Sequence, residues 1–166
     1  NLEVKQIFED IIEKWISESF ENHKLKIMLE GLVSGDTDLF EEILGDFIID
    51  TLSYFDTQKQ KDVEKVYQAF ILGMLVNLPG YEVNSERESG FGRYDISIIP
   101  KDKSKMAVIM ELKVRRKKET TQNALDSALK QICDRKYEKG ILKTGIKDIL
   151  KIGVVFDGKR VWVQKG

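Results

Sequence analysis

The stretch KMAVIMELKV, residues 105–114, decides the fold because it predicts a buried β-strand that ends in two charges. Its even-numbered residues form one apolar face: Met106, Val108, Met110, Leu112 and Val114. The opposite face is also apolar until Glu111 and Lys113, which period 2 places on the same side. A carboxylate at the end of a buried strand costs desolvation free energy unless it is paired or binds a metal. The strand therefore predicts both the centre of a sheet and a chemical site at its end.

A second strand, residues 91–99, is expected to pair with the first. The polar turn from Pro100 to Ser104 joins them in an antiparallel hairpin, in which Asp95 falls opposite residues 109–111. Cross-strand neighbours lie roughly 4.5–5.5 Å apart, and two carboxylates at that distance repel each other unless a cation lies between them. Because the chain has one histidine and one cysteine, oxygen ligands and hence Mg²⁺ or Mn²⁺ are favoured over Zn²⁺.

These positions predict a metal site formed by Asp95 and Glu111. Lys113 lies beside it, where an ammonium group can orient an attacking water or stabilise charge on a phosphorane. The alternative is an acid–base pair that staples the edge of a sheet. Spacing alone favours this alternative slightly, because an aspartate followed at a distance by Glu-x-Lys is a weak pattern.

Helices are expected before these strands, and a helix and a hairpin after them. Helical spacing of apolar residues covers residues 3–20, 24–33, 38–51, 58–77 and 120–138, and further strands are expected at 81–87, 151–156 and 159–164. This order predicts a helical segment over residues 1–56 and one α/β unit over residues 57–166.

Turn and cap residues mark several of the boundaries. Asp38 followed by Glu41 predicts a capping box at the start of the third helix. Thr120 or Thr121 is expected to cap the helix that follows the central strand. Asp157-Gly158 predicts the turn of the last hairpin.

The composition is that of a globular domain without a membrane span. Hydrophobic residues make up 42% and charged residues 33% of the 166 residues, and no apolar run reaches the roughly 18 residues that a spanning helix needs. The single cysteine excludes an intrachain disulfide and favours a reducing cytoplasm. Because the first residue is Asn1, we expect a fragment of a longer polypeptide.

The net charge is −1, so positive charge is local rather than general. One run of basic residues follows the Glu-x-Lys pair: Arg115, Arg116, Lys117 and Lys118. It predicts either a phosphate-binding surface beside the site or a solvated strand end, with equal weight. Arg87 and Arg93 are expected either to clamp phosphate or to pair with Glu86 and Glu88.

Two stretches, ERESGFGRYD at residues 86–95 and MELKV at residues 110–114, resemble the PD-(D/E)xK nuclease superfamily. They are most similar to the nuclease-like domain fused behind an AAA-ATPase-like domain in bacterial and archaeal proteins. The resemblance covers roughly residues 60–164, and the opening NLEVKQIF resembles the segment that links the two domains. It implies a covalently linked AAA-ATPase-like domain as partner.

The resemblance also implies a restriction-endonuclease-like α/β fold, with a mixed central sheet between helices. Asp95 and Glu111 would ligate Mg²⁺ or Mn²⁺, the carbonyl of Leu112 would complete the shell, and Lys113 would be the catalytic lysine.

The chain departs from the family pattern at two helices. Many members carry a glutamate on the first core helix, where this chain has Glu64 and Gln68 one turn apart, with Gln68 expected nearer the site. An amide binds metal more weakly than a carboxylate, so the second metal of a two-metal site is in question. On the later helix Gln131 is expected to touch the site, while Tyr137 is expected to pack.

These patterns leave three functions to weigh. The first is a metal-dependent nuclease that acts on DNA. The second is a module that binds nucleic acid or regulates a fused ATPase without cleaving, which the near-neutral charge and Gln68 favour. The third is an assembly domain in which residues 1–56 mediate homo-oligomerisation.

Overall fold

The computed structural model describes residue 10 and residues 19–52, 63–76, 78–85, 88–89, 92–93, 95–134 and 138–166. Its helices are α2 (Ser19–Ser34), α3 (Thr37–Leu52), α4 (Val63–Leu75), α5 (Thr121–Asp134) and α6 (Glu138–Leu142). Its strands are β1 (Tyr81–Ser85), β2 (Glu88–Ser89), β3 (Gly92–Arg93), β4 (Ile96–Pro100), β5 (Ala107–Val114), β6 (Ile149–Asp157) and β7 (Arg160–Lys165). Most of the helix expected at residues 3–20 lies outside the described residues.

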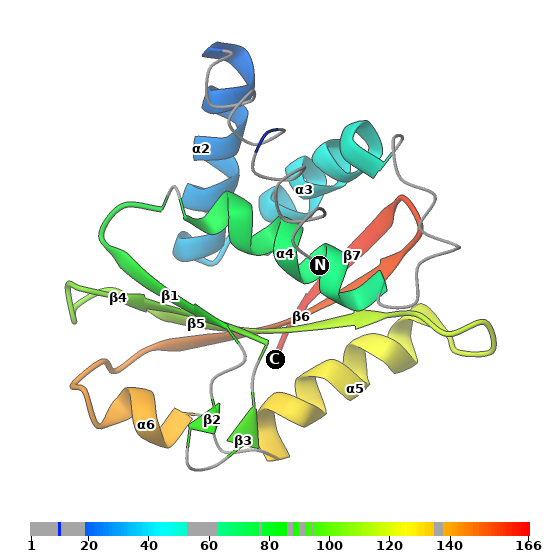
Figure 1. The fold of residues 1–166 in the computed structure, drawn as a ribbon. Helices are drawn as coiled ribbons and strands as arrows, with labels where there is room; N and C mark the ends of the chain where they lie inside the picture. Colours follow the sequence, from blue (N-terminus) through cyan, green and yellow to red (C-terminus); the bar gives the residue numbers. More distant parts are fainter. Residues whose placement is uncertain are drawn as a thin grey trace.

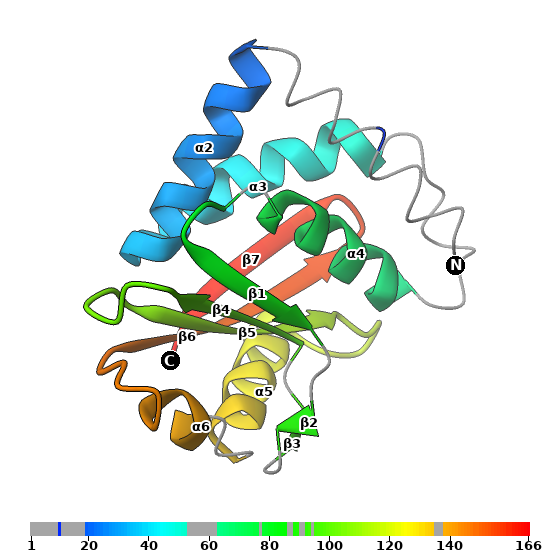
Figure 2. The same cartoon turned by 60° about the vertical axis from the view of Figure 1, so that its left-hand side comes forward.

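Five strands form one mixed sheet in the order β1-β4-β5-β6-β7. The neighbours β1, β4 and β5 pair antiparallel, β5 and β6 pair parallel, and β6 and β7 pair antiparallel. A parallel pair needs a crossover, and α5 supplies it between β5 and β6. Helices α2, α3 and α4 cover one face, and α5 and α6 cover the other (Figures 1 and 2). This arrangement confirms the predicted restriction-endonuclease-like α/β fold.

The two faces of β5 explain why the strand is apolar on both sides. Val108, Met110 and Leu112 enter the core beneath α2, α3 and α4, whereas Ala107 and Ile109 pack against the other helical layer. A strand that is buried on both faces has apolar residues at nearly every position, not at alternate positions only. The sheet is therefore closed off by helices along most of β5, and polar chemistry is confined to its end.

Helices α2 and α3 share the core of the sheet. Phe47 of α3 is buried in the same cluster as Phe70 of α4 and Phe156 of β6. Glu41 also reaches the edge strand β7, where its carboxylate accepts a hydrogen bond from the backbone N–H of Val163 at 2.5 Å. The boundary expected near residue 56 stays a prediction about sequence organisation.

None of the described helices has the length and apolarity that crossing a membrane requires.

The expected strand at residues 91–99 is wrong in one respect. It is divided at Asp95, which lies in a bend. Gly92–Arg93 pairs with Glu88–Ser89 in a separate two-stranded ribbon, and only Ile96–Pro100 joins the main sheet. The ribbon keeps the register of the β1–β4 pair, because Ser85 pairs with Ile96 and Glu88 pairs with Arg93.

The predicted capping box at Asp38 is also wrong. The backbone N–H of Leu39 donates to the carboxylate of Asp36 at 3.1 Å, so Asp36 is the N-cap and Asp38 lies in the first turn. The carboxylate of Glu41 cannot complete a box because it binds β7 instead. The predicted cap of α5 is confirmed, since the hydroxyl of Thr120 accepts from the N–H of Asn123 at 3.1 Å.

Candidate functional site

Asp95 and Glu111 face each other where β4 begins and β5 approaches its end. Ile96 pairs with Met110, so the residue before β4 and the residue after Met110 are opposed across the two strands. Glu111 is 2% exposed, and Asp95 is half-buried. The hairpin register predicted from the sequence therefore brings the two carboxylates to one place.

The carboxylate of Asp95 continues the hydrogen bonding between β4 and β5 beyond their last paired residues. Its Oδ2 accepts a hydrogen bond from the backbone N–H of Leu112 at 2.7 Å. A residue in an antiparallel ladder directs its N–H and its C=O to the same neighbouring strand. The carbonyl of Leu112 consequently lies on the Asp95 side of β5, beyond the last paired residues of that ladder, Ile96 and Met110.

A single amide links Glu111 to Lys113. The Nε2 group of Gln131 donates to Oε1 of Glu111, and the Nζ group of Lys113 donates to Oε1 of Gln131 at 3.0 Å. Both charged residues thus point to the α5 side of the sheet, as period 2 requires. The amide compensates part of the desolvation of the buried carboxylate. It also brings the ammonium group of Lys113 close to Glu111.

The position of Gln131 depends on a close contact between α5 and β6. Gly153 pairs in register with Glu111 on the neighbouring strand. A Cβ atom at Gly153 would lie 3.0 Å from Cβ of Ala128 and 3.3 Å from the carbonyl of Leu125. A side chain at this position would press the helix outward by a few tenths of an ångström. Gly153 was not among the predicted site residues, although an isolated glycine in a buried strand signals close approach of another element.

Helix α4 brings two polar residues to the same end of the sheet. Gln68 donates from Nε2 to the backbone carbonyl of Asp95 at 3.3 Å. Glu64, one turn earlier, is exposed. Its pKa is raised, first by partial loss of hydration and then by the charge of Asp95, while Lys113 and Arg116 act in the opposite direction. Gln68 therefore supports the backbone of the site, and the carboxylate of Glu64 lies within range of its charges.

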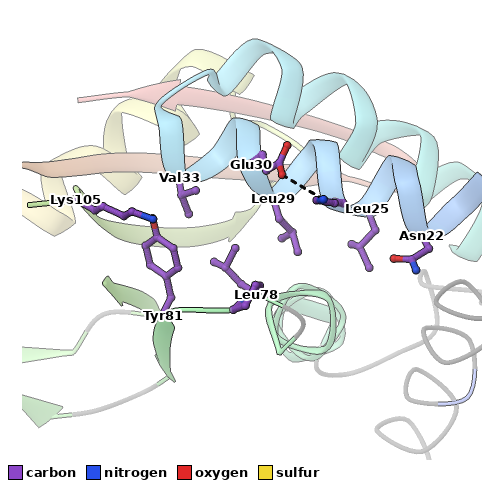
Figure 3. Close-up of a pocket in the computed structure, with 10 residues that line it drawn as sticks. Asn22, Leu25, Leu29, Glu30, Val33, Leu78, Tyr81 and Lys105 are labelled. Atoms are coloured by element: carbon purple, nitrogen blue, oxygen red, sulfur yellow. Dashed lines mark ion pairs between the residues drawn. The ribbon is translucent and has the colours of Figure 1, made fainter. Parts of the chain in front are cut away.

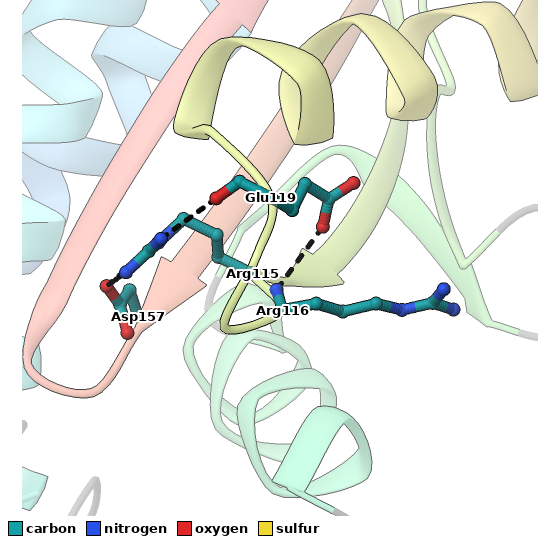
Figure 4. A network of polar contacts seen from close by, with 4 residues as sticks. All are labelled: Arg115, Arg116, Glu119 and Asp157. Carbon is teal, nitrogen blue, oxygen red and sulfur yellow. Dashed lines mark hydrogen bonds and ion pairs between the residues drawn. The ribbon is translucent and has the colours of Figure 1, made fainter.

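The basic residues after β5 differ in how they are held. Arg115 is bound within the chain: Nε and Nη2 donate to Oδ2 of Asp157 at 3.0 and 2.5 Å, and Nη1 donates to the carbonyl of Glu119 at 2.9 Å (Figure 4). Arg116 is exposed, and its side chain extends away from this network. The side chains of Arg87 and Arg93 lie outside the described residues.

The donor set fits Mg²⁺ or Mn²⁺ better than zinc. It consists of the carboxylates of Asp95 and Glu111 with the Leu112 carbonyl beside them, all hard oxygen donors. In the part of the chain that the structure describes, no cluster of three or more His, Cys, Asp or Glu side chains is arranged to hold a metal. Mg²⁺ suits such a sparse set, because it keeps several water ligands and binds proteins through one or two carboxylates.

A separate groove of about 360 Å³ lies between α2 and the segment that leads into β1, with Lys105 beside it (Figure 3). Its walls include Leu29 and Val33 of α2, with Leu78, Tyr81 and Lys105 opposite. Lys105 precedes Glu111 by six residues, which corresponds to about 20 Å along a strand. The groove is therefore distinct from the carboxylate site.

Comparison with known proteins adds one finding. A family model described as the PD-(D/E)XK nuclease superfamily matches residues 62–166. The matched stretch runs from the start of α4 to the end of β7, so it contains each of the residues that line the carboxylate site. The search of curated proteins found no match.

Proposed function

This chain belongs to the PD-(D/E)XK nuclease superfamily, and from that premise we propose that it hydrolyses phosphodiester bonds of DNA with Mg²⁺ or Mn²⁺ as cofactor. One observation carries the proposal. The end of β5 gathers the carboxylates of Asp95 and Glu111, the free end of a strand ladder at Leu112, and the ammonium group of Lys113 joined through Gln131.

Asp95, Glu111 and the carbonyl of Leu112 would hold the metal ion. When bound, such an ion lowers the pKa of a coordinated water and neutralises charge on a phosphate oxygen. The Asp95 carboxylate already has one oxygen on the N–H of Leu112, which fixes its orientation. Glu64 would contribute from α4, because its pKa is raised first by loss of hydration and then by the charge of Asp95, which places its carboxylate within reach of that charge.

Lys113 would act on the reacting phosphate. Its Nζ group is held at 3.0 Å from the neutral amide oxygen of Gln131, and from there it can turn towards an attacking water or a developing phosphorane. Gln131 would position Lys113 and Glu111 relative to each other. Gln68 would fix the backbone of Asp95. The exposed Arg116, together with Arg87 and Arg93, would contact the phosphates of the nucleic acid.

The second candidate is a module that binds nucleic acid or regulates a partner without cleaving it. It is favoured by the contact between Gln131 and Glu111, because that amide occupies one of the two oxygens that a metal would use. The resemblance to nuclease-like domains behind AAA-ATPase-like domains leads us to propose such a domain as the covalent partner in a cytoplasmic protein. Residues 1–56 would then connect the two, and could support a homo-oligomer.

Cleavage and metal binding test the proposal together. Plasmid and single-stranded DNA are incubated with the chain in Mg²⁺, Mn²⁺ or EDTA, and Mn²⁺ binding is measured by calorimetry. Glu111→Gln and Lys113→Met are each expected to lower the cleavage rate by about a hundredfold or more. Glu111→Gln should also abolish Mn²⁺ binding, whereas Lys113→Met should not. Asp102→Asn is the control, because Asp102 lies in the turn at the other end of the β4–β5 hairpin.

Each outcome separates the candidates. Cleavage that survives in both variants would refute the assignment of these residues. Salt-dependent DNA binding without cleavage in any metal would favour the non-cleaving module.

A further inference from the structure

The structure assigns to Arg115 a role different from that of the basic residues that follow it. We propose that Arg115 is a positioning residue. Through Asp157 it holds the basic loop, Arg116 to Lys118, as a fixed surface for the phosphates of a nucleic acid beside the candidate site. The inference rests on the proposed function only for the identity of the ligand. Arg115 itself does not contact phosphate.

Arg115 connects three parts of the chain. Its guanidinium donates twice to Oδ2 of Asp157, at 3.0 and 2.5 Å, and once to the carbonyl of Glu119 at 2.9 Å. Its backbone N–H donates to the carbonyl of Phe156 at 2.8 Å. The two charged side chains are only 29% and 40% exposed, so water competes less for their hydrogen bonds than at an open surface. The guanidinium is thus committed to the β6–β7 hairpin and to the end of its own loop.

The loop between β5 and α5 is closed upon itself. Glu119 accepts from the backbone N–H of Arg116 at 3.2 Å through its carboxylate, and its own N–H donates to the carbonyl of Arg116 at 3.0 Å. The side chains of Arg116, Lys117 and Lys118 are all exposed. In Figure 4 the Arg116 side chain points away from the contact between Arg115 and Asp157, and it is exposed. The contacts of Arg115 with Asp157 and Glu119 form a tether. This tether therefore orders the backbone of the loop and leaves the three cations exposed.

The hairpin that carries Asp157 is itself anchored. The Tyr67 hydroxyl donates to the carbonyl of Gly158 at 2.6 Å, and the Tyr67 ring stacks on Phe156 with ring centres 4.2 Å apart and planes 7° apart. Tyr67 precedes Gln68, which binds the backbone of Asp95. The first turns of α4, the hairpin and the basic loop lie at the same end of the sheet in both views (Figures 1 and 2). The loop is consequently fixed relative to the site.

Arg116 lies within electrostatic range of the candidate site. The pKa of Glu64 is raised by burial and by Asp95, and the positive charge of Arg116 opposes that rise. A row of exposed cations beside a metal site suits a chain of phosphates, where one phosphate reacts and its neighbours are held by charge.

Replacing Asp157 distinguishes a tether from a phosphate ligand because the two roles predict opposite effects. If Arg115 contacted phosphate, Asp157→Asn would release its guanidinium and strengthen binding. If Arg115 is a tether, Asp157→Asn frees the loop and weakens binding. Asp46→Asn is the matched control: it removes the same charge from a part-exposed ion pair with Lys24, which joins α2 to α3. Any general gain from a lost negative charge appears in both variants.

The experiment uses the whole chain in EDTA, so that cleavage does not interfere. Binding of a fluorescent DNA duplex is followed by anisotropy over a range of salt concentrations, and trypsin cleavage within residues 115–118 is timed separately. Relative to Asp46→Asn, Asp157→Asn is expected to weaken binding and to speed tryptic cleavage by roughly threefold to fivefold, the range of a part-exposed ion pair. Arg115→Lys should bind as weakly as Arg115→Gln, because lysine keeps the charge but cannot replace the planar fork.

Three results would overturn the inference. Tighter DNA binding by Asp157→Asn than by Asp46→Asn would make Arg115 a phosphate ligand. Equal tryptic rates in these two variants would mean that the ion pair does not hold the loop. Failure of the unaltered chain to bind DNA at any salt concentration would mean that the basic loop is not a surface for nucleic-acid phosphates. The metal site is judged separately by Mn²⁺ binding, so a failure of this inference and a failure of the proposed function can be told apart.

Discussion

Gly153 is the point at which α5 lies closest to the sheet, and we expect Gly153→Ala to disturb both stability and the candidate site. The added Cβ would lie 3.0 Å from Cβ of Ala128 and 3.3 Å from the carbonyl of Leu125. Neither atom belongs to a flexible side chain that could turn aside. The helix as a whole must therefore move.

The size of the effect follows from these distances. Two carbon atoms reach their best separation at about 3.5–4.0 Å, so α5 must retreat by a few tenths of an ångström. Overpacking of this kind typically costs about 1–3 kcal/mol. Gln131 lies three residues beyond Ala128, on the same side of the helix, and moves with it. Its contact with the Nζ group of Lys113, now 3.0 Å, would lengthen to about the limit of a hydrogen bond.

Urea denaturation and cleavage rates measure the two consequences. Gly140→Ala in α6 is the control, because a Cβ there meets no atom within 4 Å. The double variant Gly153→Ala with Ala128→Gly removes the closest clash, although glycine within a helix costs about 1 kcal/mol. We expect the double variant to be more stable than the sum of the single changes predicts. Unfolding free energies of Gly153→Ala and the unaltered chain within about 0.5 kcal/mol, together with additivity in the double variant, would refute the reasoning.

Three further changes test other parts of the structure. Because the pKa of Glu64 is raised on folding, its ionised form opposes folding above that pKa, and the effect vanishes as the pH falls below the pKa of an unfolded glutamate. Glu64→Gln should therefore raise the melting temperature in EDTA at neutral pH but not in acid. In saturating Mg²⁺ the unaltered chain should instead have the higher melting temperature. Equal stabilisation of the variant and the unaltered chain by Mg²⁺ would contradict a ligand role for Glu64. Asp36→Ala should lower the free energy of unfolding by about 1 kcal/mol in urea denaturation and Asp38→Ala by under about 0.5 kcal/mol, because Asp36 caps α3. Equal losses in the two variants would contradict the assignment of Asp36 as the N-cap. Tyr67→Phe should keep the ring stacking but lose about 1 kcal/mol with the hydrogen bond to Gly158, measured in the same way; an unchanged unfolding free energy would mean that water replaces the hydroxyl.

Much of the fold could be predicted because its elements differ sharply in period. The apolar runs that became α2, α3 and α4 follow helical spacing, whereas the central strand is a short continuous apolar run that ends in Glu111 and Lys113 on one face. The Asp157-Gly158 turn was predictable because Gly158 adopts a positive φ of 58°, which glycine tolerates. The division of residues 91–99 was not, because both halves are extended and only the partner strand differs.

The cap of α3 shows a second limit. Asp36 and Asp38 are equally good N-cap residues in sequence, and Glu41 stands at the spacing of a capping box from Asp38. Which aspartate caps the helix depended on β7, because the Val163 N–H donates a hydrogen bond to the Glu41 carboxylate and so removes Glu41 from a capping box. A contact between residues so far apart in the chain leaves no local pattern.

The same division applies to the candidate site, where local regularity and long-range packing contribute different residues. The sequence alone determined that Glu111 and Lys113 share a face and that Asp95 lies opposite them, because both follow from strand period and hairpin register. Only the tertiary structure decided that Gln131 would join the acid to the base, since this depends on how closely α5 approaches Gly153. It also decided that Arg115 would bind Asp157 rather than face solvent beside Arg116. Neighbouring arginines in a basic run are alike in sequence, and their surroundings in the folded chain differ because only one of them meets a carboxylate.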